Sequence, residues 1–85
     1  MAWQPRIARQ AAKKLAKIPS KDRERLAAAI GEMRDSPFSG DVARLKNESA
    51  ARRRRVGNYR IFFDVNVEAL VVDVTDVRRR TTTTY

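Results

Sequence analysis

The chain has 85 residues, enough for one small domain, residues 1–85, with no room for a second hydrophobic core. Its 19 lysines and arginines against 10 acidic residues give a formal net charge of +9, so we expect a polyanionic partner, with nucleic acid the first candidate. The sequence has no cysteine and no histidine, which excludes disulfides, thiolate nucleophiles and the commonest metal ligand and general base. We expect neither a metal site nor a cofactor.

The sequence also argues against a membrane protein. No apolar run approaches the roughly 18 residues that a membrane-spanning helix needs, and the N-terminal residues lack the apolar core of a secretory signal. We therefore expect a cytoplasmic protein without a membrane partner.

The N-terminal half predicts two helices. Residues 3–7 can form at most a brief edge strand, because Pro5 lacks the N–H that an inner strand needs. A first amphipathic helix follows, since apolar residues recur at helical spacing at Ile7, Ala11, Leu15 and Ile18. Pro19 interrupts it, and a second helix is expected from about Lys21 to just before Asp35. The two should form a hairpin.

The C-terminal half predicts strands. Turn residues fill 36–40, and beyond them apolar residues alternate. We expect a short strand near Leu45, one long strand or a bent pair over 52–65, a turn at 66–68 and a last strand over 69–75. Helices followed by strands predict an α+β fold, in which an N-terminal helical hairpin covers one face of a small, mainly antiparallel sheet. The other face would be open for function.

Arginines concentrate on the predicted strands. The run Arg52–Arg55 and Arg60 place five arginines within nine residues, and a second cluster, Arg78–Arg80, follows the last strand. Strand alternation sends Arg60 to the open face and divides the run, with Arg53 and Arg55 on one face and their two neighbours on the other. Such clusters are either solvated charge or a phosphate-binding cradle. Guanidinium groups bind phosphate through two parallel hydrogen bonds. The clusters lie on strands rather than in a tail, and this favours the cradle.

Three segments together resemble one known family. They are Leu45-Lys46-Asn47, the string from Arg53 to Val65 and the C-terminal stretch from Val74 through Arg80 to Tyr85, and the most specific part is Arg-Val-Gly-Asn-Tyr-Arg-Ile-Phe-Phe. They closely resemble the RelE/ParE toxin superfamily over nearly the whole chain. The resemblance implies a toxin of a type II toxin–antitoxin pair, with a twisted antiparallel sheet packed on a helical hairpin. It also implies a cognate antitoxin as partner, with DNA contacted only through the antitoxin complex.

Two activities occur on this fold. RelE-like members cut mRNA in the ribosomal A site, whereas ParE-like members poison DNA gyrase without cutting RNA. The resemblance to the first branch implies catalytic roles for Arg53, Arg55, Arg60, Arg80 (or its neighbour Arg79) and Tyr85. Other cations are expected to bind RNA phosphates: Lys46, Arg52, Arg54, Arg78 and Arg79. We expect a metal-independent endoribonuclease that acts on ribosome-bound mRNA; gyrase inhibition is the alternative, and a plain RNA-binding module is a third.

RNA can be cleaved without a metal ion or histidine. The 2′-hydroxyl attacks the adjacent phosphate, leaving a 2′,3′-cyclic phosphate and a free 5′-hydroxyl, and this step needs a proton acceptor, a proton donor and charge stabilisation. An arginine stays protonated at any relevant pH and is therefore a poor proton acceptor. Tyr85 is a candidate if the arginines lower its pKa, and it could alternatively stack on a nucleobase. Lys46 is the second candidate for a proton role.

Overall fold

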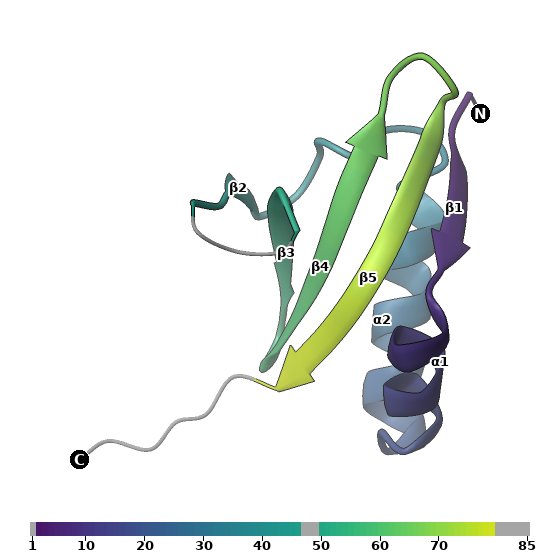
Figure 1. The fold of residues 1–85 in the computed structure, drawn as a ribbon. Helices are drawn as coiled ribbons and strands as arrows, with labels where there is room; N and C mark the ends of the chain where they lie inside the picture. The colour runs from purple at the N-terminus through teal and green to yellow at the C-terminus, as the bar shows by residue number, and fades with distance from the viewer. Residues whose placement is uncertain (1, 47–49, 80–85) are drawn as a thin grey trace.

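The computed structural model describes residues 2–46 and 50–79 and has an α+β fold, as predicted. One five-stranded sheet has the order β1-β5-β4-β3-β2, and both helices lie on one of its faces (Figure 1). Among the strands of the described residues, only β1 and β5 pair in parallel. In chain order the elements are β1 (Gln4–Ile7), α1 (Arg9–Ala16), α2 (Ser20–Glu32), β2 (Val42–Arg44), β3 (Arg52–Val56), β4 (Tyr59–Asn66) and β5 (Val71–Arg79).

The hydrophobic core lies between the helices and the sheet. The brief edge strand and both predicted helices are confirmed, although α1 begins at Arg9 because Ile7 still belongs to β1. The face of β4 predicted to be apolar does turn toward the helices. Alternation of side chains along the strand accounts for this face. The buried core comprises Ala11, Leu26, Ala29, Ile30, Met33, Tyr59, Ile61, Phe63, Val72, Val74 and Val77.

The arginine-rich run forms an antiparallel hairpin, which is the bent pair of the two alternatives. Strands β3 and β4 pair from Val56 opposite Tyr59 to Arg52 opposite Phe63. Gly57 has φ +57° in the two-residue turn between them, a conformation that suits glycine at the first central position of a type II′ turn. The short strand expected near Leu45 is β2 and ends one residue earlier, at Arg44.

The last strand differs most from the prediction. It covers Val71–Arg79 rather than 69–75, because the turn occupies 67–70 and Leu70 has φ +56°, which no strand residue adopts. A β-bulge then shifts its register: Phe63 is opposite Val74, but Phe62 is opposite Asp76. Thr75 is therefore an extra residue.

The bulge reverses the facing of the end of β5. Under strict alternation Val74, Asp76 and Arg78 would all face the helices, whereas Val74 and Val77 do so in the structure. Asp76 and Arg78 share the open face with the β4 residues opposite them. Strand β1 stops alongside Val74, and beyond it α1 covers the edge of β5, where the Gln10 side-chain amide donates to the Thr75 carbonyl at 2.7 Å.

Candidate nucleic-acid interface

Three arginines form a row across the open face of the sheet. Arg55 on β3 lies directly opposite Arg60 on β4, which in turn lies opposite Arg78 on β5. Directly opposite residues project to the same face, and neighbouring strands are about 4.8 Å apart, so three guanidinium stems leave the sheet side by side. Like charges in such positions destabilise a strand pair. This arginine row is therefore an arrangement that an anion would stabilise.

Two members of the row lack a hydrogen bond at a buried nitrogen. The Nε atoms of Arg55 and Arg60 are buried and, within the part of the chain that the structure describes, neither has a hydrogen-bond partner. A buried donor without an acceptor costs about 1–3 kcal/mol, and more when the group is charged. A phosphate seated on the row would supply the missing acceptors.

An aromatic ring lies beneath the row. Phe62 is only 5% exposed, and its neighbours across the sheet are Arg53 and Asp76. The guanidinium carbon of Arg78 lies 4.4 Å from the centre of the Phe62 ring, which is a cation–π contact. Arg78 is thus held flat against the sheet next to Arg60.

Asp76 holds the end of the row. Its carboxylate accepts hydrogen bonds from Lys14 Nζ at 2.7 Å, Arg78 Nε at 3.0 Å and the Val77 N–H at 2.8 Å. Burial by itself raises the pKa of the Asp76 carboxyl, but the hydrogen bonds from Lys14, Arg78 and Val77 outweigh burial and leave the pKa below its ordinary value of 3.8. An ionised carboxylate with these bonds is a poor proton acceptor and instead orients Arg78.

A second carboxylate, that of Asp41, lies at the β3 end of the arginine row. Asp41 precedes β2, and its two carboxylate oxygens lie 3.4 Å from Arg53 Nη1 and 3.8 Å from Arg55 Nε. The Asp41 side chain is 58% exposed, so these ion pairs are well solvated and weak. An incoming phosphate would compete with Asp41 for the two arginines.

The other half of the arginine run lies on the helix side. Arg54 donates to the Ala29 carbonyl at 3.2 Å and to Glu32 Oε1 at 2.5 Å, and its side chain is only 12% exposed. Arg52 lies over the Phe38 ring with its guanidinium carbon 4.9 Å from the centroid. Arg54 therefore fastens β3 to α2, and Arg52 contacts the loop between α2 and β2. The expected role of both arginines in binding RNA phosphates stays a prediction.

The remaining expected residues are dispersed. Lys46 is exposed and follows β2, away from any described contact with the row. Arg79 pairs with Tyr59 on the helix side. Arg80 and Tyr85 lie outside the described residues, so their expected roles stay predictions.

The comparisons with known proteins give the family. A model of the ParE toxin of the type II toxin–antitoxin system parDE matches residues 6–83. The chain belongs to the RelE/ParE toxin superfamily. No curated protein matches it in sequence.

Solved structures of several toxins share the fold of this chain. A RelE–RelB complex from Pyrococcus horikoshii OT3 is 21% identical with a TM-score of 0.79, covering 98% of this chain and 100% of that one. The isolated E. coli RelE toxin is 24% identical with a TM-score of 0.80, covering 96% and 88%. A RelB–RelE complex from Methanococcus jannaschii is 28% identical with a TM-score of 0.69, covering 86% and 87%. The toxin therefore has a RelE-like fold.

Three site residues of the toxin were not anticipated from its sequence. Phe62 shares the alternation of Arg60, which could have indicated a ring beneath the arginines. Asp76 falls on the open face only because of the bulge, and Asp41 reaches the arginines from a loop. Among the described residues, neither helix is long or apolar enough to cross a bilayer.

Proposed function

We propose that this toxin is an endoribonuclease that cleaves ribosome-bound mRNA in the A site, with the scissile phosphate on the arginine row. The observation that carries the proposal is the row itself, in which the buried Nε atoms of Arg55 and Arg60 have no hydrogen-bond partner among the described residues. Arginine forks match the geometry of phosphate oxygens and remain charged at neutral pH. The structural likeness to E. coli RelE supports the same function.

Each residue has a defined task in the proposed reaction. The 2′-oxygen bonds to phosphorus, the bond from phosphorus to the 5′-oxygen breaks, and the products are a 2′,3′-cyclic phosphate and a 5′-hydroxyl. Arg53, Arg55 and Arg60 stabilise the extra negative charge of the transition state. The 2′ proton leaves to an acceptor, for which Tyr85 and Lys46 remain the proposed candidates, and the departing 5′-oxygen takes up a proton. Arg80 is proposed to assist at the phosphate.

The ribosome is proposed to supply the rest. It would hold the mRNA in an extended, oriented conformation, so the toxin would need little machinery for positioning its substrate. A site made mainly of arginines suits this division of labour, because it contributes charge stabilisation rather than substrate folding.

A cognate antitoxin is the second proposed partner. The solved structures from Pyrococcus horikoshii and Methanococcus jannaschii are complexes of a toxin with RelB. We propose that an acidic or amphipathic antitoxin covers the arginine row, because complementary charge accelerates association and buried arginines make strong interface anchors. The toxin would contact DNA only through this complex. Failure of a co-expressed neighbouring gene product to copurify and relieve growth arrest would refute the antitoxin proposal.

A specific observation keeps gyrase inhibition as the alternative. The matching family model is the ParE one, and Asp76, the buried carboxylate of the open face, already accepts hydrogen bonds from Lys14, Arg78 and Val77. A ParE-like inhibitor would need the basic surface but no proton acceptor.

One experiment separates the two functions. The toxin is induced briefly in cells, the 5′ ends of mRNA are sequenced, and gyrase supercoiling is assayed with purified toxin. The ribonuclease proposal predicts new 5′-hydroxyl ends in phase with codons and unchanged supercoiling. Intact mRNA together with blocked supercoiling would replace it with the gyrase function.

A further inference from the structure

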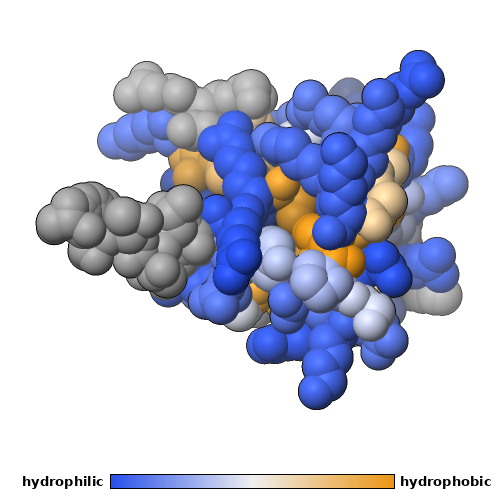
Figure 2. Space-filling view, turned by 90° about the horizontal axis from the view of Figure 1, so that it is seen from below, coloured by the Kyte–Doolittle hydropathy of each residue, from blue (hydrophilic) through white to orange (hydrophobic). Residues whose placement is uncertain are grey.

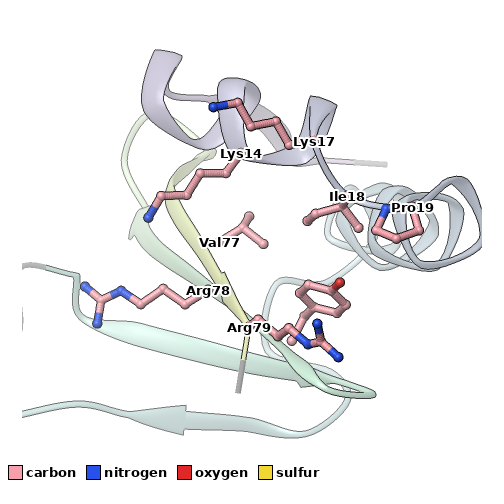
Figure 3. A pocket seen from close by; sticks show the side chains of 8 residues that line it. Lys14, Lys17, Ile18, Pro19, Val77, Arg78 and Arg79 are labelled. Atoms are coloured by element: carbon pink, nitrogen blue, oxygen red, sulfur yellow. The ribbon is translucent and has the colours of Figure 1, made fainter. Parts of the chain in front are cut away.

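A second basic site lies on the helix side of the sheet. Its cavity has a volume of about 430 Å³, within the range of about 300–1,000 Å³ typical of small-ligand sites. It lies where β5 ends and the two helices meet, and the view onto this end shows apolar surface framed by hydrophilic side chains (Figure 2). Its lining residues are Lys14, Lys17, Ile18, Pro19, Tyr59, Val77, Arg78 and Arg79 (Figure 3).

The floor of this pocket is apolar and partly aromatic. Ile18 and Pro19 come from the connection between the helices (Figure 3). Tyr59 belongs to β4 and Val77 to β5. Tyr59 is buried in the core, yet its hydroxyl has no hydrogen bond to any described residue. A flat ring could pack on this floor and exchange a hydrogen bond with the Tyr59 hydroxyl, since nucleobases combine an apolar face with a polar edge.

The rim of the pocket is cationic. Lys17 and Arg79 form no ion pair with an acidic residue in the described ranges, while Lys14 and Arg78 are both held by Asp76, at 2.7 and 3.0 Å. Lys17 and Arg79 therefore give the pocket a positive rim above its apolar floor. The complement of such a pocket is a ligand with a flat apolar part and an anionic part.

The pocket and the arginine row meet at the end of β5. Arg78 lies opposite Arg60 on the open face, whereas Arg79 lies opposite Tyr59 on the helix side. The two neighbouring side chains leave the strand in different directions (Figure 3). A polyanionic strand on the row can thus continue around the end of β5 to a second set of cations.

We propose that this pocket binds one nucleotide of the RNA, with the base on the Ile18, Pro19, Tyr59 and Val77 floor and the phosphate on Lys17 and Arg79. The position of this nucleotide next to the cleavage site rests on the proposed ribonuclease function. The affinity of the pocket for a nucleotide is independent of that function. Inorganic phosphate would use the rim but gain nothing from the floor.

The test maps ligand binding on the full toxin by NMR. Adenosine 5′-monophosphate and inorganic phosphate are titrated separately, and amide shifts are followed. The nucleotide is expected to shift the amides of Lys17, Ile18, Val77 and Arg79. It should bind at least about 10-fold more tightly than phosphate, because only the nucleotide has a base that packs on the apolar floor.

Three variants sharpen the result. Tyr59→Phe keeps the ring and removes only the hydroxyl, and should weaken the nucleotide by roughly 3- to 10-fold, the scale of one hydrogen bond. The double variant Lys17→Ala with Arg79→Ala should weaken it by about 10-fold or more, the scale of charge-assisted phosphate bonds. Lys13→Ala removes a charge from the same helix outside the pocket and should leave the affinity unchanged.

The outcomes separate this inference from the ribonuclease. Equal binding of phosphate and nucleotide, or shifts confined to Arg55 and Arg60, would overturn the pocket proposal. The proposal would also be overturned if the nucleotide shifted none of these amides while the antitoxin protected them from hydrogen exchange. The pocket would then be a protein interface. Nucleotide binding in the pocket of a toxin that leaves mRNA intact would sustain the pocket and refute the ribonuclease.

Discussion

Arg60 lies in β4, between two other arginines of the row, and its Nε atom is buried. Arg60→Ala is expected to leave the toxin folded and to lower mRNA cleavage by about 10²-fold or more, the usual scale for losing one preorganised transition-state donor. Arg60→Lys should restore RNA binding more than the rate, because an ammonium cannot replace the two-pronged guanidinium. Cleavage is measured by primer extension in a cell-free translation reaction.

The control for Arg60 is Arg9→Ala. Arg9 is exposed at the start of α1, far along the chain from the row, and its loss changes the net charge equally. The Arg9→Ala variant should cleave mRNA as fast as the unchanged toxin. Equal activity of the Arg60 and Arg9 variants would remove Arg60 from the site.

Asp76 makes a prediction about pH. Its lowered pKa means that the folded state binds the Asp76 proton less readily than the unfolded state, whose pKa is the ordinary 3.8. The stabilisation is fully present above about pH 5 and is lost as the pH falls through the lower folded-state pKa. Asp76→Asn should therefore cost about 1–3 kcal/mol of unfolding free energy at pH 7 and less at pH 3, where the unfolded chain is already protonated at this residue. Urea unfolding of the unchanged toxin and of the Asp76→Asn variant at both pH values measures this. An equal difference in unfolding free energy at the two pH values would contradict the prediction.

At the scale of elements, one face of β3 packs on α2 and the other belongs to the open face of the sheet. Arg54 is held by Ala29 and Glu32 of α2, whereas the hydrogen bonds of the Arg53 side chain go to the exposed Asp41. Arg54→Ala should lower the free energy of unfolding by about 1–3 kcal/mol and spare RNA binding, while Arg53→Ala should do the reverse. Urea unfolding and binding of a 2′-O-methyl RNA measure the two effects. Comparable losses of stability in both variants would mean that the facing of β3 is wrong.

Local periodicity predicts most of the fold. The helical spacing of apolar residues locates α1 and α2, and the two-residue alternation of β4 by itself places Arg60 and Phe63 on opposite faces. The α+β class follows from the order of these elements. Local patterns suffice here because each element has one apolar face.

The last strand could not be predicted in this way. The extent of β5 depends on Leu70 adopting φ +56°, and the position of Asp76 depends on an extra residue at Thr75. The first belongs to the turn between β4 and β5 and the second to the pairing of β5 with β4, so the alternation within β5 encodes neither. The separation of Arg54 from Arg53 did follow from alternation, but the partners of Arg54 on α2 are distant in sequence.

The whole molecule carries a formal charge of +9, and the row and the pocket concentrate part of it. Affinity for single-stranded RNA should fall steeply with salt, with a log–log slope of about −0.7 for each neutralised phosphate. Arg60→Ala should make that slope shallower by about 0.7, while Arg9→Ala should not change it. Fluorescence anisotropy with a 2′-O-methyl RNA measures the slopes. Affinity that does not depend on salt would exclude phosphate contacts as the basis of binding.

The bulge at Thr75 has a consequence for how β5 tolerates change. The core-facing side chains of β5 are at even-numbered positions before the bulge and at odd-numbered positions after it. Deletion of Thr75 would remove the extra residue and leave one strict alternation, with Val74 and Val77 still toward the core and Asp76 and Arg78 still on the open face. We expect that variant to keep cooperative unfolding by circular dichroism, because Val77 stays in the core and Asp76 stays on the face where it contacts Lys14. The extra residue thus lets Val74 and Val77, which are three positions apart, face the same core.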